Sequence, residues 1–424
     1  MRRWAFRILS ALVVLLAIFC AFVWAVEFYP RRVAHPPLKL AQGTLAIEHA
    51  RIYISPTDPP IDDGSILIRD GLIAAVGRQI EIPPGTTEVP CDHCIVTAGF
   101  WNAHVHFTEP KWAGAEWKSA ATLNPQLADM FLSRGFTTVI DVGSNPADTL
   151  SIRRRVESTE LNGPFIYTSG PPLYPPHGIP YYLDDLPWWI RLLMHMPKTP
   201  VEAQEDVRSN LNAGADLTKL FTGSWVARGR VLPMPLNIAK AAVETSHLNG
   251  KLVFAHPSNL AGTRVAIDSG VDVLAHAPDD TAGIGKALFA TMVEKNMAMT
   301  PTLKMFAWTV TADKSYLEPI YAEVREFHEL GGTLMFGTDV GYMTDYSTDG
   351  EFDALAKCGL TTSDVLAMLT TNPAARMGVS AQKGTVAAGK LADLTVLDAD
   401  PSVNLTNFAR VKAVVRSGRV VWHQ

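Results

Sequence analysis

The sequence predicts an α/β fold: a (β/α)8 TIM barrel with a small β-sandwich domain formed by both chain ends. Three observations predict it. The middle of the chain alternates strand-like and helix-like segments eight times, and both ends consist of short β-type runs separated by turns. Six polar residues recur at the ends of predicted strands, and in such a barrel the carboxyl ends of all strands converge on one mouth.

The predicted organisation has five segments. They are a membrane anchor or signal segment (1–26), a linker (27–42), the N-terminal portion of the β-sandwich (43–95), the barrel (96–378) and the C-terminal portion of the β-sandwich (379–424).

The composition is that of a globular protein with one apolar segment. Of 424 residues, 47% are hydrophobic and 19% are charged, and the formal net charge is −5. This length accommodates one large and one smaller domain. No run of Lys or Arg forms a basic stripe, which argues against a nucleic-acid partner. The composition does not specify an oligomeric state, so an oligomer stays open.

The first 26 residues predict a membrane-anchoring helix. Three arginines precede an apolar run, 8–26, that only Ser10 interrupts. Its length is close to the roughly 20 residues that a helix needs to cross a bilayer, whereas secretory signals usually have an apolar core of about 7–15 residues. The positive charge before the run predicts the N-terminus inside and the folded body outside, in the periplasm. Secretion after signal cleavage is the alternative.

The β-type runs at both ends are bounded by turn residues. Asp-Gly and Pro-Pro-Gly breaks separate the runs of 43–89, and "KGTVAAGKLADLTVLDAD" and "VKAVVRSGRVVW" are typical of strands near the C-terminus. We expect the two ends to meet in one small sheet domain.

Cys91 and Cys94 form a Cys-x-x-Cys pair within the first β-rich segment. No second cysteine pair completes a structural zinc site. In an oxidising compartment a local disulfide is one use of the pair, and two free thiols are the other.

The predicted barrel strands end before polar or irregular segments. Helical patterns between them, such as "EAQEDVRSNLNAG" and "EPIYAEVREFHELGG", end in glycine as a helix C-cap does. The longest irregular stretch, 170–200, is dense in Pro, Tyr and Trp, and we expect it to lie over the barrel mouth. The predicted strand ends are Trp101, Val142, Ser169, Phe221, Ala255, Ala275, Thr302 and Thr338.

Five of the recurring polar residues have the chemistry of metal ligands. His104 and His106 lie two apart in an extended segment, so both imidazoles point to the same side and can hold one ion. His256 and His276 follow later strands, and Asp339 follows the eighth. Taken alone, such a histidine is more often hydrogen-bonded in the core or at the surface than a metal ligand, and such an aspartate is more simply a helix N-cap. Their recurrence at the strand ends of one barrel favours a metal site.

Lys219, in "GADLTKLFTG", is the sixth recurring residue. A lysine near the end of a buried strand is costly unless it is paired or neutralised. A salt bridge is one account. The other is that the amine takes up carbon dioxide and becomes a carbamate, an anionic ligand that can bridge two cations about 3.5–4 Å apart.

With these residues the chain resembles the amidohydrolase superfamily, in particular its imidazolonepropionase-like and prolidase-like branch with binuclear metal centres. The resemblance covers roughly 43–424 and includes "TAGFWNAHVH", "FGTDVG" and "GTVAAGKLADLTVLD". It implies two divalent metal ions, with zinc as the expected metal. It also implies a ligand set: one metal on His104, His106 and Asp339, a second on His256 and His276, and a bridging carbamate on Lys219.

Two segments depart from the pattern of this family. The branch often carries a Gly-Gly-His-type loop, and the nearest match here is "PPHG", where His177 would contact the substrate or stabilise an oxyanion. The segment "TGSWVARGR" follows Lys219 in place of a run of glycines. Its Arg228 and Arg230 would bind a substrate carboxylate as a fork, or lie on a solvated loop.

The predicted function is a metal-dependent hydrolase that cleaves an amide (C–N) bond of a small substrate, such as a dipeptide or an N-acyl amino acid. A metal-bridging hydroxide would attack the carbonyl carbon, and Asp339 would accept its proton and pass it to the leaving nitrogen. Asp339 and His177 are the expected catalytic residues.

Two other functions stay open at this point. One is a mononuclear hydrolase or deaminase of a cyclic substrate, such as a cyclic amide or a lactone, with Lys219 unmodified. The other is a non-enzymatic, membrane-tethered binding or redox protein that uses the aromatic-rich loop or the Cys91–Cys94 pair. Metal content per chain separates the two enzyme hypotheses.

Overall fold

The computed structural model describes residues 38–191, 194–310 and 314–424, together with residues 7, 10, 12–18 and 20. Most of the predicted anchor or signal segment, and 27–37 of the predicted linker, lie outside these residues. Within the described ranges, no helix is long and apolar enough to cross a membrane. The membrane anchor and the signal segment therefore stay predictions.

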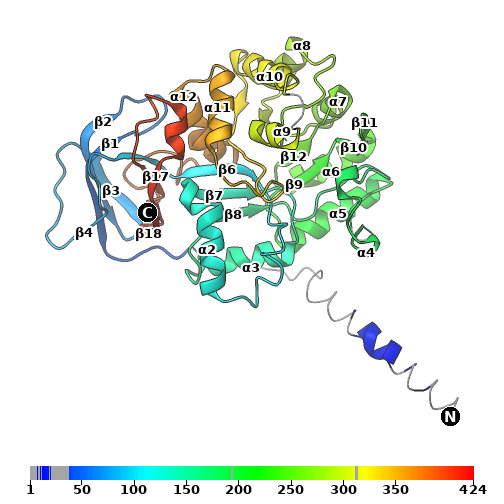
Figure 1. Ribbon diagram of the computed structural model, residues 1–424, viewed down its shortest axis with the longest axis horizontal. Coiled ribbons are helices and arrows are strands. Elements are labelled where there is room, and N and C mark those ends of the chain that lie inside the picture. Colours follow the sequence, from blue (N-terminus) through cyan, green and yellow to red (C-terminus); the bar gives the residue numbers. More distant parts are fainter. Residues whose placement is uncertain are drawn as a thin grey trace.

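Strands from both chain ends share one eight-stranded sheet, which Figure 1 shows on the left. Its strands are β1 (Thr44–Ile52), β2 (Ile61–Arg69), β3 (Leu72–Gly77), β4 (Thr87–Glu88), β5 (Ile95–Ala98), β16 (Leu394–Leu397), β17 (Val411–Arg416) and β18 (Arg419–His423). The order is β18-β17-β16-β5-β1-β2-β3, with β4 paired to β1.

The pairing of β16 with β5 joins the two ends of the chain. These strands are antiparallel, and Val396 lies opposite Val96. Both side chains belong to a hydrophobic core of this sheet, together with Ile47 and Val415. The chain ends therefore meet as predicted, while the predicted domain limits and the sandwich form stay predictions.

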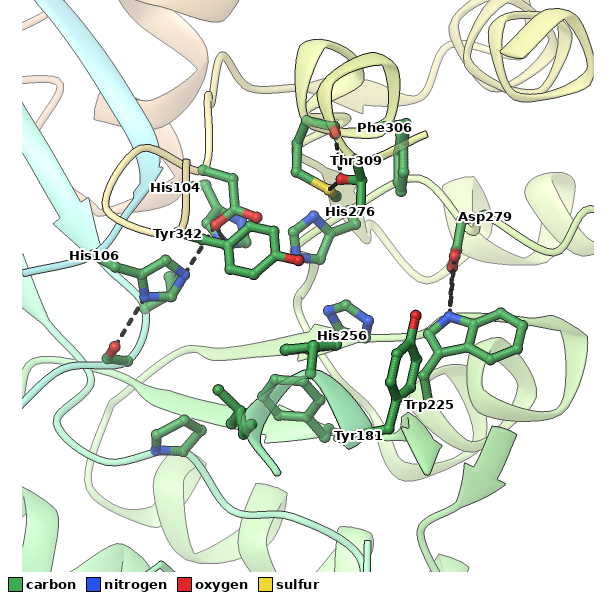
Figure 2. A pocket seen from close by; sticks show the side chains of 18 of the residues that line it. His104, His106, Tyr181, Trp225, His256, His276, Asp279, Phe306, Thr309 and Tyr342 are labelled. Atoms are coloured by element: carbon green, nitrogen blue, oxygen red, sulfur yellow. Dashed lines mark hydrogen bonds and ion pairs between the residues drawn. The ribbon is translucent and has the colours of Figure 1, made fainter. Parts of the chain in front are cut away.

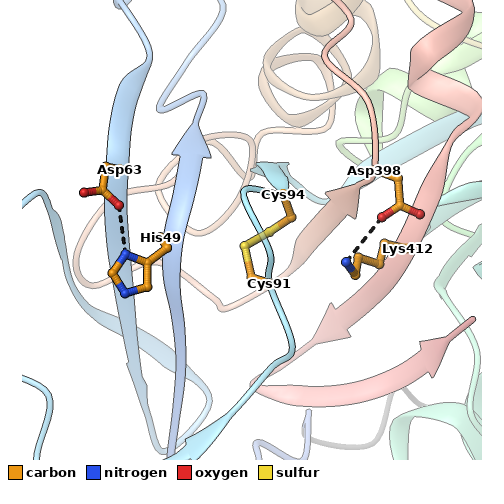
Figure 3. The surroundings of a disulfide bond; sticks show 6 residues. All are labelled: His49, Asp63, Cys91, Cys94, Asp398 and Lys412. Atoms are coloured by element: carbon orange, nitrogen blue, oxygen red, sulfur yellow. Dashed lines mark hydrogen bonds and ion pairs between the residues drawn. A yellow bond between two sulfur atoms is a disulfide. The ribbon is translucent and has the colours of Figure 1, made fainter.

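Cys91 and Cys94 form a disulfide beside this sheet (Figure 3). Cys94 is buried in the core of the sheet, and Cys91 packs against that core. Of the two uses predicted for the pair, the structure has the disulfide.

The middle of the chain forms parallel strands in two sheets. The three-stranded sheet β6-β7-β8 and the five-stranded sheet β15-β14-β13-β12-β9 together supply the eight expected strands. These strands are β6 (Phe100–Val105), β7 (Phe136–Asp141), β8 (Phe165–Thr168), β9 (Thr218–Phe221), β12 (Val253–His256), β13 (Val273–Leu274), β14 (Ala298–Met299) and β15 (Thr333–Leu334).

Among the described residues, the backbone hydrogen bonds that join the two sheets are isolated ones. The amide of Asp216 donates to Thr168 O at 2.7 Å, and the amide of Ala103 donates to Phe336 O at 2.7 Å. No continuous ladder closes the ring within the described residues, so the fold is TIM-barrel-like rather than the closed barrel predicted. Pro171 and Pro172 follow β8, and proline has no N–H with which to extend a ladder.

Helices cover the outside of these strands, as Figure 1 shows. The predicted glycine signal is confirmed at α5, where Gly214 ends the helix in the left-handed conformation. At the start of this helix, Thr199 accepts a hydrogen bond from the Glu202 amide. The helices are α2 (Ala120–Met130), α3 (Pro146–Glu157), α4 (Trp188–Arg191), α5 (Pro200–Ala213), α6 (Leu236–Leu248), α7 (Leu260–Ser269), α8 (Lys286–Glu294), α9 (Leu303–Thr309), α10 (Leu317–Glu329), α11 (Asp349–Lys357), α12 (Thr362–Leu369) and α13 (Thr371–Arg376).

The strand side chains divide between two hydrophobic clusters. Trp101, Ala103 and Phe254 belong to a small inner cluster. Phe100 and Ala255, their neighbours along the strands, belong to the large cluster that includes the helices. This alternation follows from the period of two in a strand, and it leaves the carboxyl ends of the strands free to carry polar groups.

Candidate metal centre and substrate cavity

A cavity of about 550 Å³ lies at the carboxyl ends of the parallel strands. The six predicted metal-centre residues come from β6, β9, β12 and the turns after β6, β13 and β15. The structure therefore brings together residues that are far apart in the sequence. All six line the cavity: His104, His106, Lys219, His256, His276 and Asp339.

The turn that carries Asp339 lies directly against the end of β6. The amide of Asp339 donates to His104 O at 2.9 Å, and the amide of His106 donates to Val340 O at 2.8 Å. Gly341, at φ 100°, permits this contact, because a Cβ there would lie 2.0 Å from His106 O. The backbone thus fixes the aspartate beside both histidines.

Both histidines of the His-x-His pair are held through Nδ1. The Nδ1 of His104 is 2.6 Å from Ala275 O, and the Nδ1 of His106 is 2.9 Å from Gly143 O. A carbonyl oxygen only accepts, so Nδ1 carries the proton in each ring. In the neutral imidazole the Nε2 lone pair is then available to a metal ion.

The two Nε2 atoms converge on one carboxylate oxygen. Asp339 Oδ1 lies 3.2 Å from Nε2 of His104 and 3.0 Å from Nε2 of His106. Burial lowers the pKa of His104 to about 4, so this ring is neutral at neutral pH. The pKa of Asp339 lies well below its ordinary value: burial would raise it, but the two histidines outweigh that effect. The Nε2 lone pair of the neutral His104 ring thus faces an anionic oxygen.

Such an arrangement is repulsive unless a cation lies between the groups. His104 Nε2 and Asp339 Oδ1 are buried and make no hydrogen bond of acceptable geometry within the described residues. The ligand atoms of His104, His106 and Asp339 all lie within 4.8 Å of one another. Two imidazoles and a carboxylate are a donor set that suits a divalent ion such as zinc. The residues present therefore fit a metal ion.

His256 and His276 form a second pair beside the first. Their ring centroids are 4.5 Å apart, and the ring of His276 is 4.3 Å from that of His104. Nδ1 of His276 lies 2.7 Å from Thr302 Oγ1, whose own proton goes to Pro301 O. Nδ1 of His276 therefore donates, and its Nε2 is left free. Burial holds the pKa of both rings well below the ordinary value.

Lys219 is buried in β9 with 2% of its surface exposed. No carboxylate in the described ranges lies within ion-pairing distance of its Nζ, so the structure does not contain the salt bridge that was one account of this residue. Burial lowers the pKa of the Lys219 amine to about 7, against the opposing charges of Asp339 and Asp141. A substantial fraction of this amine is therefore neutral at neutral pH.

Aromatic side chains form much of the remaining cavity wall. Figure 2 shows the histidines on one side, with Tyr342 near them, and Tyr181, Trp225 and Asp279 on another. The aromatic-rich segment 170–200 supplies Tyr174, Tyr181 and Tyr182. This agrees with the position over the barrel mouth that was predicted for it. The aromatic residues of the wall are Tyr174, Tyr181, Tyr182, Phe221, Trp225, Phe306, Tyr316 and Tyr342.

Comparison with known proteins identifies the family of this chain. The model of the amidohydrolase family matches residues 95–421, which is more than half of the chain. The chain belongs to the amidohydrolase family. Membership supports an enzyme that hydrolyses amide bonds, and the metal-fitting residues described above all lie within the matched range.

The similarity to several relatives extends over most of this chain. Ochratoxinase of Aspergillus niger is 21% identical and matches 89% of this chain and 87% of its own. Imidazolonepropionase of Symbiobacterium thermophilum is 24% identical and matches 85% of this chain and 90% of its own. A solved Xaa-Pro dipeptidase with bound methionine has a TM-score of 0.76 at 22% identity, covering 90% of this chain and 100% of that one. At such identities the structural likeness supports the fold.

The predicted substrate residues differ in their positions. Arg228 lines the cavity, at the turn of the hairpin formed by β10 (Gly223–Ala227) and β11 (Arg230–Pro233). Arg230 and His177 are exposed and are not among the residues that line the cavity. The substrate and catalytic roles of these three residues stay predictions.

The sequence interpretation missed Asp279 and Trp225 as cavity residues. Trp225 lies in the segment after Lys219 that departs from the family pattern, and Asp279 follows His276 by three positions. The signal that the sequence offered for each of them was its nearness to a predicted metal ligand. Their contact, in which Trp225 Nε1 lies 3.0 Å from Asp279 Oδ2, joins segments that no local pattern relates.

Proposed function

We propose that this chain is a metal-dependent amidohydrolase that cleaves the amide bond of a small substrate, a dipeptide or an N-acyl amino acid. One observation carries the metal dependence: two imidazole lone pairs meet the same buried oxygen of Asp339, at 3.0 and 3.2 Å. A bound cation is the simplest group that makes this arrangement favourable.

The centre would hold two divalent ions, expected to be zinc. His104, His106 and Asp339 would hold one, and His256 and His276 the other. When bound, such ions polarise a carbonyl group and lower the pKa of water. Asp339 would accept a proton from the attacking water and deliver it to the leaving nitrogen, which a carboxylate at the centre of the site can do.

Lys219 would join the two halves of the centre as a carbamate. Its neutral amine would attack carbon dioxide, form an N–C bond and release one proton. Two features support this role: the amine is buried, and within the described ranges it has no carboxylate partner. The carbamate would offer two oxygens as metal ligands. It would also bring a negative charge, which the four imidazoles of the centre do not supply.

The cavity suits a substrate with an apolar group and an anionic end. A volume of about 550 Å³ is in the range of small-molecule sites. The aromatic wall would pack against the apolar group and exclude water. Arg228, at the hairpin turn, would bind the carboxylate of a peptide or an N-acyl amino acid.

A mononuclear hydrolase or deaminase of a cyclic substrate is the second candidate. It is favoured by the close grouping of His104, His106 and Asp339. Among the described residues, these three form the group whose ligand atoms lie close enough together to hold one metal ion. In this case Lys219 would stay an unmodified amine. The non-enzymatic alternative is disfavoured by the family membership.

Hydrolysis and metal content test the proposal together. The purified full-length chain, in detergent, is supplied with zinc and bicarbonate and assayed against a library of dipeptides and N-acyl amino acids. We expect hydrolysis together with about two metal ions per chain, as in two-metal hydrolytic sites. About one ion per chain, with activity confined to cyclic substrates, would support the mononuclear alternative instead.

A further inference from the structure

Asp279 places an uncompensated carboxylate in the wall of the substrate cavity. Among the described residues outside the metal centre, Asp279 and Arg228 are the charged side chains that line it. The structure has no ion pair between Asp279 and any Lys, Arg or His of the described ranges. An anionic group removed from water without a cationic partner is costly, so a cationic ligand in the cavity would stabilise the ionised form of Asp279.

The hydrogen bond from Trp225 satisfies only some of the acceptor capacity of this carboxylate. Trp225 Nε1 lies 3.2 Å from Oδ1 and 3.0 Å from Oδ2 of Asp279 (Figure 2). One N–H cannot occupy the roughly four lone-pair sites of a carboxylate. The neutral indole also leaves the charge in place. Trp225 therefore orients Asp279 while leaving oxygen lone pairs open to a donor in the cavity.

The environment of Asp279 is desolvated and aromatic. Burial raises its pKa to about 7. Burial raises the pKa of two cavity tyrosines, Tyr182 and Tyr316, and the charge of Asp279 adds to this effect. Aromatic faces attract cations as well as apolar groups, so the aromatic wall and the carboxylate favour the same kind of ligand.

We propose that Asp279, oriented by Trp225, is the subsite for a positively charged group of the substrate, an ammonium or a guanidinium. The inference rests on the proposed amide hydrolysis and narrows its substrate class to cationic or zwitterionic amides. In a zwitterion, the carboxylate would go to Arg228 and the cation to Asp279. The cation is either the free α-ammonium of a dipeptide or the side chain of a basic residue.

Two matched substrate pairs separate these two sources. The first pair is a dipeptide with a free N-terminus and its N-acetylated form, which lacks the α-ammonium. The second pair places lysine or norleucine at one position of an N-acetylated dipeptide, so that only the side-chain amine differs. The pair in which the enzyme prefers the cationic member identifies the group bound by Asp279.

The wild-type chain is compared with Asp279→Asn, which keeps the shape of the side chain and an oxygen for Trp225. We expect the wild type to prefer the cationic member of one pair by roughly tenfold or more in kcat/KM, as for other charge-assisted contacts. The Asn variant should lose this preference, because its kcat/KM for the cationic member should fall to about that for the neutral member. Asp280→Asn, at a neighbouring carboxylate that does not line the cavity, should behave as wild type.

Equal preferences in the wild type and Asp279→Asn overturn the inference. Metal content measured on each variant shows that the centre is intact, so a loss specific to the cationic substrate is not a loss of metal. If the metal-loaded wild type hydrolyses no compound, the proposed function fails. The subsite is then decided by calorimetric binding of the same pairs: tighter binding of the cationic member that Asp279→Asn abolishes supports it, and equal binding overturns it.

Discussion

The Nε2 atom of His104 lies 3.2 Å from Oδ1 of Asp339, and both atoms are buried. The proton of His104 resides on Nδ1, because the carbonyl of Ala275 requires a donor there. A nitrogen lone pair and a carboxylate oxygen are thus held together by the backbone contacts between β6 and the turn after β15. This is the geometry of two ligands around one cation.

Asp339→Asn should lower kcat by roughly 10²- to 10⁴-fold, because the amide can neither accept a proton nor contribute a negative charge. We expect the metal content to fall in parallel, as measured on the dialysed protein by elemental analysis. The control is Asp398→Asn, whose carboxylate contacts Lys412 at the surface and is worth little there. Wild-type kcat in Asp339→Asn would contradict its role in proton transfer.

Thr302→Val should weaken metal affinity by roughly 10- to 100-fold, the usual effect of removing a residue that orients a ligand. The hydroxyl of Thr302 accepts the Nδ1 proton of His276 at 2.7 Å, and valine keeps the shape of threonine without this acceptor. A titration with a zinc indicator measures the affinity. Thr302→Ser restores the hydroxyl and should restore the binding, which a purely structural role of the methyl group would not allow.

Labelled bicarbonate should give a carbamate carbon signal in the ¹³C NMR spectrum of the metal-loaded protein. The amine of Lys219 is buried with a pKa lowered to about 7, so the neutral form that attacks carbon dioxide is available near neutral pH. Lys219→Met, which fills a similar volume, should abolish the signal and reduce the metal content. Two bound ions per chain in the methionine variant would argue against a bridging carbamate.

Glu323→Gln should flatten the pH dependence of stability. Burial raises the pKa of Glu323 to about 9, and within the described ranges neither of its oxygens has a hydrogen-bond partner. Between the ordinary pKa of about 4.3 and this raised value, the folded protein keeps a proton that the unfolded chain has released. The free energy of unfolding of the wild type therefore falls as pH rises through this window.

The measurement is Tm from about pH 5 to about pH 8.5. Relative to wild type, the Tm of Glu323→Gln should rise across this range by about 3 °C or more, since 1 kcal/mol shifts Tm by roughly 2–4 °C in domains of about 150–250 residues and by less in longer chains. Glu329→Gln changes an exposed position of the same helix α10, and its Tm should change with pH in the same way as that of the wild type. A parallel curve for Glu323→Gln as well would mean that Glu323 is ionised in the folded protein.

The apolar run at 8–26 should retain the full-length chain in the membrane fraction of a bacterial host, with the catalytic body in the periplasm. A variant that begins at residue 38 should be released from that fraction. N-terminal sequencing of the full-length product provides the check. A product that begins near Val26 and is free of the membrane fraction would establish signal cleavage in place of anchoring.

Local patterns in the sequence were enough to find most of the metal-fitting group. The ligands follow apolar runs of strand length, and parallel strands in a barrel-like ring bring their carboxyl ends to one mouth whatever the loops do. His104, Lys219 and Asp339 could therefore be grouped without knowing a single contact. Glycine caps such as Gly214 likewise marked helix ends, because the left-handed conformation is a local requirement.

The sequence by itself determined the alternation of strands and helices, the six residues around the centre and the meeting of the chain ends. Tertiary structure alone decided that Asp279 meets Trp225, that His177 is not among the residues that line the cavity, and that no continuous ladder closes the ring within the described part of the chain. The reason is physical: periodicity and turn signals act over a few residues. The direction of a loop side chain depends on packing between segments that are distant in the chain.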